Sequence, residues 1–236
     1  MNVALVLAGG TGTRMHTASI PKQFLECDGK PIIIYTLEKF ERNHNIDCIV
    51  VVCVESWIEE LKNILDRFHI TKVVKIVSGG TNGQESIRFG LESINEMDSS
   101  TIVLIHDSVR PLIDNDIIDK NIEIVKNKGN CITCSKATET IAVECDLEMK
   151  FVNRNTTLLA RAPQSFLLGD LLSAHIRAKM EGQTSFVDSA SLMYYYGHKI
   201  NYVIGPTDNI KITTPIDFFV FKAVMQAHNN LKVFGY

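Results

Sequence analysis

A glycine-rich segment near the start of the chain has the composition of a phosphate-binding loop. Residues 7–15 read Leu-Ala-Gly-Gly-Thr-Gly-Thr-Arg-Met and come at the end of a short apolar run. Glycines let backbone N–H groups approach phosphate oxygens closely, and Arg14 adds a positive charge. Met15 stands where the dinucleotide-binding fingerprint has its third glycine, and the Gly-Lys-Ser/Thr end of a P-loop is missing. The segment is therefore either a phosphate cradle or a tight turn with an incidental arginine.

Two further side chains could serve the same ligand. Lys22 follows Arg14 closely enough for both cations to reach one polyphosphate, although a lone lysine is normally a solvated surface group. Asp107 directly follows an apolar run. Its carboxylate could hold Mg²⁺ against phosphates, because that ion prefers hard oxygen ligands, or it could simply cap a turn.

The elements that must position these residues alternate along the chain. Predicted strands cover residues 3–7, 48–54, 73–77 and 101–105. Predicted helices cover residues 31–40, 56–68 with Ser56 as its cap, 84–97 and 114–129. This order predicts a Rossmann-like α/β fold, in which a mostly parallel sheet carries helices on both faces. Ligands bind beyond the carboxyl ends of such strands, which here are residues 8–10, 78–80 and 106–108.

The alternation is interrupted between about residues 136 and 160. Two alternating stretches at 137–144 and 150–152 flank an acidic turn, so we expect a projecting β-hairpin arm. An isolated two-stranded hairpin is marginally stable in water, and the simplest partner for this one is a second copy of the chain. The sequence thus predicts one domain over residues 1–236 that forms a homodimer through its arm. After the arm we expect helices near 168–182, 187–197 and 215–230, and strands near 199–204 and 209–213.

Composition narrows the class of protein. The 236 residues include 24 basic and 27 acidic side chains, for a net charge of −3, which argues against a protein that coats nucleic acid or an anionic membrane. No apolar stretch approaches the roughly 18 residues that span a bilayer. The apolar N-terminus has no basic leader and soon meets glycines, unlike a signal peptide. We therefore expect a cytoplasmic protein.

The six cysteines suggest buried, reduced thiols. One pair, Cys131 and Cys134, has the spacing of a redox motif. It follows a helix stop rather than opening a helix, and it is expected at the start of a strand, where positions i and i+3 point to opposite faces. No second pair or nearby histidine completes a zinc site. Redox chemistry at this pair remains an alternative.

Five ordered motifs give the chain a family resemblance. They are the segment at 7–15, Pro-Lys-Gln-Phe at 21–24, His-Asp-Ser-Val-Arg-Pro at 106–111, Asn-Arg-Asn at 153–155 with Ala-Pro-Gln-Ser-Phe at 162–166, and Asp-Asn-Ile-Lys-Ile-Thr at 208–213. From residue 3 to about residue 224, the chain resembles the cytidylyltransferases that act on 2-C-methyl-D-erythritol 4-phosphate or on D-ribitol 5-phosphate.

The resemblance implies a site for CTP, a polyol phosphate and a divalent metal ion. CTP would lie on a loop formed by Leu7, Ala8, Gly9 and Gly10, and its base and ribose on a second loop that includes Gly80, Thr81, Gln84 and Ser86. Mg²⁺ would be held by Asp107, with Asp208 as a possible second ligand. Ser108 and Arg110 would contact the ligands. The cations assigned to catalysis would be Arg14, Lys22, Arg154 and Lys211.

In this reading, Arg154 and Thr140 belong to the arm and reach the partner's site, so their roles depend on dimerisation. A phosphate oxygen of the polyol phosphate would attack the α-phosphorus of CTP in line, and pyrophosphate would leave. No general base is needed, because a phosphate monoester is already ionised at neutral pH.

Two questions stay open at the level of sequence. The motifs at 7–10 and 106–111 favour ribitol 5-phosphate, for teichoic acid or capsule synthesis, whereas residues 186–192 resemble the methylerythritol branch of isoprenoid synthesis. Val187 and Ala162 depart from the threonines common at these positions. A nucleotide-binding regulator is the alternative of another class, but such a protein would not need Arg14, Lys22, Asp107 and Lys211 together.

Overall fold

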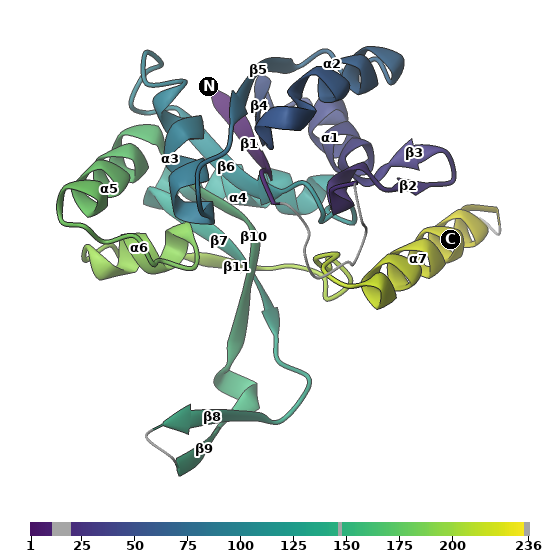
Figure 1. Ribbon diagram of the computed structural model, residues 1–236. Helices are drawn as coiled ribbons and strands as arrows, with labels where there is room; N and C mark the ends of the chain where they lie inside the picture. The colour runs from purple at the N-terminus through teal and green to yellow at the C-terminus, as the bar shows by residue number, and fades with distance from the viewer. Residues whose placement is uncertain (11–19, 146–147, 234–236) are drawn as a thin grey trace.

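A seven-stranded sheet forms the centre of the protein (Figure 1). The computed structural model describes residues 1–10, 20–145 and 148–233. The sheet strands are β1 (Asn2–Ala8), β4 (Cys48–Cys53), β5 (Val73–Ser78), β6 (Ile102–Asp107), β7 (Asn130–Lys136), β10 (Leu158–Leu167) and β11 (Tyr202–Ile204). Their order is β11-β7-β10-β6-β1-β4-β5, and only β10 runs antiparallel to its neighbours. The predicted mostly parallel α/β fold is confirmed.

Helices cover both faces of this sheet. They are α1 (Ile32–Arg42), α2 (Ile58–Arg67), α3 (Gly83–Glu92), α4 (Asn115–Lys128), α5 (Leu168–Met180), α6 (Ser189–Tyr195) and α7 (Pro215–Val233). Side chains of a strand alternate between its faces, and β1 follows this rule. Ala4 and Val6 join the core beneath α1, α2 and α4, whereas Val3 and Leu5 join the core beneath α3, α5 and α6. This double burial explains why the central strands are continuous apolar runs.

Several helix ends follow the sequence signals. Asp114 caps α4 by accepting a hydrogen bond from the backbone N–H of Ile117, and Gly129 ends that helix with a φ of 84°. The predicted cap at Ser56 is wrong, because this residue lies in a short 3₁₀ turn, η3 (Glu55–Trp57), before α2 begins at Ile58. The helix predicted to reach Met97 ends at Glu92.

Two predictions about strands need correction. Strand β10 was not expected, because Arg161 and Pro163 interrupt its apolar pattern; a register shift between Ala160 and Gln164 accommodates the interruption. The strand expected at 209–213 is absent from the described structure. This segment is instead a loop, which is tied to the residues just after β6 by a backbone hydrogen bond from the N–H of Ile212 to the carbonyl oxygen of Val109, at 2.9 Å. Nearby, Phe221 of α7 packs into a third, smaller core.

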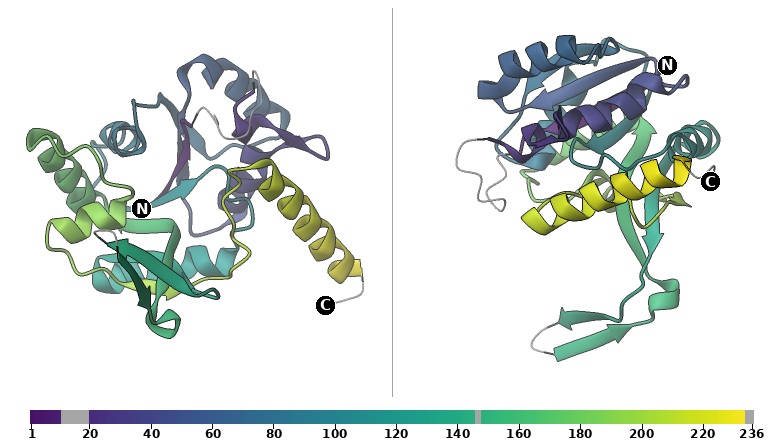
Figure 2. Two further views of the ribbon diagram at one scale, coloured as in Figure 1. Left: turned by 60° about the horizontal axis from the view of Figure 1, so that its bottom comes forward. Right: turned by 90° about the vertical axis from the view of Figure 1, so that its right-hand side faces the viewer.

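The predicted hairpin projects from the sheet, as Figures 1 and 2 show. It consists of β8 (Ile141–Cys145) and β9 (Glu148–Val152), which pair antiparallel and belong to no larger sheet. Most of its apolar side chains are exposed in the single chain; Phe151 is 70% exposed and Met149 is 67% exposed. A small ribbon of β2 (Glu26–Cys27) and β3 (Lys30–Pro31) precedes α1. Within the described part of the chain, none of the helices is long and apolar enough to cross a membrane.

Candidate active site

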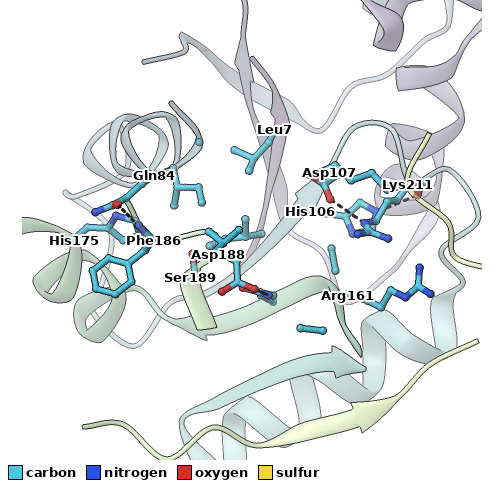
Figure 3. A pocket seen from close by; sticks show the side chains of 18 residues that line it. Leu7, Gln84, His106, Asp107, Arg161, His175, Phe186, Asp188, Ser189 and Lys211 are labelled. Atoms are coloured by element: carbon cyan, nitrogen blue, oxygen red, sulfur yellow. Dashed lines mark hydrogen bonds and ion pairs between the residues drawn. The ribbon is translucent and has the colours of Figure 1, made fainter. Parts of the chain in front are cut away.

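Two adjoining cavities lie at the carboxyl ends of β1 and β6. The first, which we call the glycine-loop cavity, has a volume of about 400 Å³ and lies among residues 7–10, 80–83 and 107–109. The second, the β10 cavity, has a volume of about 270 Å³ and lies among residues 160–164, 186–189 and 105–110 (Figure 3). Leu7, Gly83, Asp107 and Lys211 line both cavities. Two ligands bound side by side would therefore meet at Asp107 and Lys211.

The glycine loop after β1 is held by a buried side chain that the sequence did not single out. Gln23 is 1% exposed, and its amide nitrogen donates hydrogen bonds to the carbonyl oxygens of Ala8 (2.6 Å) and Gly10 (3.1 Å). Gln23 belongs to η2 (Lys22–Phe24), so it also fixes the segment that carries Lys22 on the wall of the glycine-loop cavity. Its place beside Lys22 was the only signal in the sequence. The predicted Arg14 lies outside the described residues.

The loop between β5 and α3 forms another wall of the glycine-loop cavity. The Ser86 hydroxyl donates to the carbonyl oxygen of Asn82 (2.8 Å) and accepts from the backbone N–H of Gly80 (3.0 Å). A side chain at Gly80 would collide with Glu85, whose Cγ lies 2.3 Å from the position of an added Cβ. The predicted residues Gly80, Thr81 and Ser86 all line this cavity. Only glycine therefore fits where the loop turns back on α3.

Gln84 has a different position from the one expected of a nucleotide-binding residue. It lines the β10 cavity, and its side-chain amide is bonded to the loop before α6. Its nitrogen donates to the carbonyl oxygen of Gln183 (2.8 Å), and its oxygen accepts from the backbone N–H of Phe186 (3.1 Å). Gln84 thus connects the first turn of α3 with the segment that forms the far wall of the β10 cavity.

The junction of the two cavities is an ion-pair cluster. Asp107, the last residue of β6, accepts from Lys211 Nζ (2.8 Å) through Oδ1 and from Arg110 Nε (2.9 Å) through Oδ2. Burial alone would raise the pKa of Asp107, but the charges of Lys211 and Arg110 outweigh it and lower the pKa to about 2. The carboxylate is therefore ionised at neutral pH and holds both cations at the cavity wall.

The remaining predicted residues of this region differ in their access to the cavities. Ser108 is 1% exposed and lines the glycine-loop cavity, and its carbonyl oxygen accepts from the Thr36 hydroxyl at 2.8 Å. Arg110 lines the β10 cavity and donates to the carbonyl oxygen of Asn209 at 3.0 Å. Asp208, next to Asn209, is not among the described residues that line either cavity.

The floor of the β10 cavity contains polar residues that sequence reasoning missed. Gln164 of β10 donates to Asp188 Oδ2 (2.8 Å) and accepts from the backbone N–H of Ala190 (3.0 Å). Asp188 also caps α6, because its Oδ1 accepts from the backbone N–H of Ser191. Arg161 lines the same cavity. Gln164 and Asp188 lie in the segments 162–166 and 186–192 that carry the family resemblance, but neither they nor Arg161 were assigned a role from the sequence.

Two predicted site residues lie on the arm. The Arg154 guanidinium donates to the carbonyl oxygen of Thr138 at 3.2 Å, and Thr140 is exposed just before β8. Neither residue lines the glycine-loop or the β10 cavity of its own chain. Both residues therefore lie away from these two cavities in the single chain.

The junction of the two cavities offers a metal ion the carboxylate of Asp107. Within the described ranges, no cluster of three or more His, Cys, Asp or Glu side chains could hold a metal ion by itself. Mg²⁺, however, is commonly held by one or two carboxylates together with substrate phosphates. Asp107 fits this mode as a single protein ligand, because each carboxylate oxygen keeps a second lone pair beside its bonded cation.

The cysteine pair in β7 has no features of a redox site. Both Cys131 and Cys134 are buried, and all six cysteines carry free thiols. Burial, together with the neighbouring Cys134, raises the pKa of Cys131 to about 12, and burial also raises the pKa of Cys134. The thiolate is the reactive form, so the structure favours the interpretation of these cysteines as core residues.

Known proteins resemble this chain over its whole length. Residues 2–227 match the model of the family IspD: 2-C-methyl-D-erythritol 4-phosphate cytidylyltransferase. A ribitol-5-phosphate cytidylyltransferase of Vibrio parahaemolyticus is 53% identical over 100% of both chains. A 2-C-methyl-D-erythritol 4-phosphate cytidylyltransferase of Clostridium acetobutylicum is 34% identical over 97% of this chain and 99% of its own.

The fold has the same relatives. The crystal structure of 4-diphosphocytidyl-2C-methyl-D-erythritol synthase from Anaerococcus prevotii superposes with a TM-score of 0.82 at 25% identity. It covers 95% of this chain and 98% of that one. A family model, full-length relatives and a common fold agree, and the chain belongs to the IspD family of cytidylyltransferases.

Proposed function

We propose that this enzyme transfers the cytidylyl group of CTP to D-ribitol 5-phosphate and so forms CDP-ribitol and pyrophosphate. The observation that carries the choice of acceptor is the difference in identity among relatives. The ribitol-5-phosphate cytidylyltransferase is 53% identical to this chain, whereas the methylerythritol enzyme is 34% identical. A ribitol-5-phosphate cytidylyltransferase of Streptococcus agalactiae, at 44% identity, lies between them.

The glycine-loop cavity is suited to CTP. Backbone groups at residues 8–10 and at Gly80 can approach the nucleotide without side chains in the way, and Lys22 stands on the cavity wall. Lys22 and Arg14 would neutralise the triphosphate, Arg14 on the strength of its motif alone. Cations aimed at charge that develops during reaction commonly contribute about 3 kcal/mol each.

The β10 cavity is suited to the acceptor, because it meets the glycine-loop cavity at Asp107 and Lys211. A phosphate oxygen of the acceptor forms the new bond to the α-phosphorus of CTP. The bond between that phosphorus and the oxygen bridging to the β-phosphate breaks, and pyrophosphate leaves with its electron pair. Lys211 is held at the junction of the two cavities by its ion pair with Asp107, where it would lie beside the reacting phosphates and stabilise charge. Arg110 supports the same carboxylate from the other side.

Asp107 would hold Mg²⁺ together with the CTP phosphates, where the ion would supply further charge neutralisation. Asp208 has less support as a ligand, because it is not among the described residues that line either cavity. The cation pairs of Asp107 keep its carboxylate ionised and fixed in orientation.

The arm is proposed as the dimerisation element of a one-domain chain. Its exposed Phe151 and Met149 would be buried against a second copy, which is the common closed arrangement for identical chains. Arg154 and Thr140 would then reach the acceptor phosphate in the partner's site. We further propose a cytoplasmic enzyme, in keeping with its reduced thiols.

Methylerythritol 4-phosphate is the alternative acceptor, favoured by the family model and by the 34% identical relative. The decisive experiment measures pyrophosphate release from CTP with each of the two polyol phosphates in turn. The proposal predicts rapid release with ribitol 5-phosphate and slow release with methylerythritol 4-phosphate. Binding of CTP without release for either acceptor would instead favour a nucleotide-binding regulator.

A further inference from the structure

Arg161 is a cation of the β10 cavity that has no carboxylate partner among the described residues. It lies on β10 within the register shift between Ala160 and Gln164, and its Nε donates to the Ser135 hydroxyl at 3.1 Å. None of the ion pairs between described residues includes it. One nitrogen thus anchors the guanidinium to β7, while no hydrogen bond to a described residue uses its two terminal nitrogens.

The charges around Arg161 leave this end of the cavity positive. Arg110 and Lys211 share the single carboxylate of Asp107. The other carboxylate of the cavity, Asp188, is bonded to Gln164 and to the first turn of α6. Figure 3 shows Arg161 and Lys211 on the same side of the cavity, with Asp188 across from them. At this end of the cavity, Arg161, Arg110 and Lys211 therefore carry three positive charges against the single carboxylate of Asp107.

This arrangement is unfavourable for Arg161 in the unliganded protein. Partial burial lowers the pKa of its guanidinium, and the nearby positive charge of Arg110 lowers it further. A partly desolvated cation next to a like charge is normally compensated by a hydrogen-bonded anion. The planar guanidinium of Arg161, whose two terminal nitrogens donate to no described residue, matches the oxygens of a phosphate in geometry.

We propose that Arg161 binds the phosphate of the acceptor substrate and thereby sets the affinity for that substrate. The assignment to the acceptor rather than to CTP follows from position, because Arg161 lines only the β10 cavity. It rests on the proposed function, in which a polyol phosphate occupies that cavity. Arg161 lies in the same chain as Lys211. It would therefore bind the acceptor phosphate without a contribution from the arm of a second copy.

The test compares Arg161→Gln and Arg161→Lys with the wild type in initial-rate measurements of pyrophosphate release. D-ribitol 5-phosphate is varied at saturating CTP, and CTP is varied at saturating acceptor. Arg42→Gln is the matched control, because the Arg42 side chain is 72% exposed on α1, outside both cavities. Melting temperatures of all variants report on the fold.

Arg161→Gln is expected to raise the KM for the acceptor roughly 10- to 100-fold, the usual effect of losing a charge-assisted hydrogen bond. The KM for CTP should stay within about twofold, and Arg161→Lys should recover part of the acceptor affinity. An unchanged acceptor KM, a rise in the KM for CTP instead, or a fall in kcat that parallels a lower melting temperature would overturn the proposal.

A second measurement separates this proposal from the proposed function. If the wild-type enzyme turns over no polyol phosphate, the proposed function fails, and ³¹P NMR titration with inorganic phosphate then tests Arg161 alone. Weaker phosphate binding in Arg161→Gln than in Arg42→Gln would support Arg161 as a phosphate ligand. Equal binding in the two variants would overturn it.

Discussion

Lys211 Nζ lies 2.8 Å from Asp107 Oδ1, although 104 residues separate the two in sequence. The contact joins the end of a central strand to the loop before the last helix, and it stands where the two cavities meet. Because Arg110 binds the other oxygen of Asp107, the carboxylate orients two cations at once. The chemistry of the proposed reaction is concentrated at this ion-pair cluster.

Replacement of Lys211 is expected to affect turnover rather than folding. Lys211→Ala should lower kcat by roughly 10²-fold or more, because a positioned cation is lost where charge develops in the transition state. Lys222→Ala is a suitable control, since its side chain is 42% exposed and also pairs with an aspartate, against 41% exposure for Lys211. Near-normal turnover in Lys211→Ala would show that the lysine is a surface group only.

The side chain of Gln84 is predicted to preserve the shape of the acceptor cavity. Gln84→Ala removes both hydrogen bonds to residues 183 and 186, so the loop before α6 should become less ordered. We expect the KM for ribitol 5-phosphate to rise roughly three- to tenfold, with little change in the KM for CTP. Gln226→Ala is the control, because it removes a side-chain amide from an exposed position of α7. Equal changes in both KM values would contradict this account.

Much of this architecture was predictable from the sequence, for physical reasons. The strands β1, β4, β5 and β6 are buried on both faces, so each is an unbroken apolar run ending in small or polar residues. Their carboxyl ends located the site, and Asp107 and Lys211 were found through motifs. Apolar runs and short motifs are local features of the sequence, so they can be recognised without knowledge of the tertiary structure.

What escaped prediction depends on contacts between distant segments. Strand β10 carries Arg161 and Pro163, so its pattern resembled a loop until pairing with β6 and β7 revealed it. Gln23 and Gln164 lie in two of the quoted motifs, but their roles appear only through hydrogen bonds to the glycine loop and to α6. The homodimer remains a prediction, because it concerns a surface between two chains.

Stability should depend on pH through His175. This histidine is 2% exposed on α5, and burial, with a smaller contribution from Arg88, lowers its pKa to about 4. Between pH 6.5 and pH 4 the unfolded state therefore binds more protons than the folded state, and the free energy of unfolding rises with pH. The contribution is fully present above pH 6.5 and is lost as the pH falls towards 4, at up to about 1.4 kcal/mol per pH unit.

Urea denaturation between pH 4.5 and pH 7 measures this effect. His175→Leu should show a shallower rise of unfolding free energy with pH than the wild type. His44→Leu, at an exposed position, should keep the wild-type slope. Identical slopes in all three proteins would exclude His175 as the source.

The arm hypothesis predicts complementation between two inactive variants. Arg154→Ala and Lys211→Ala should each lose most activity, because each removes a cation from both sites of the dimer. After subunit exchange, half of the dimers are mixed and each has one intact site, so activity should recover to about a quarter of the wild-type value. Native mass spectrometry verifies the exchange. If mixed dimers form without recovery, Arg154 does not serve the partner's site.

The choice of acceptor is tested most directly by competition in one tube. The enzyme is given CTP with equal concentrations of D-ribitol 5-phosphate and 2-C-methyl-D-erythritol 4-phosphate, and early products are quantified by mass spectrometry. Our account predicts that CDP-ribitol forms in large excess. Predominance of the CDP-methylerythritol product, or the absence of both CDP-polyols while CTP remains bound, would contradict it.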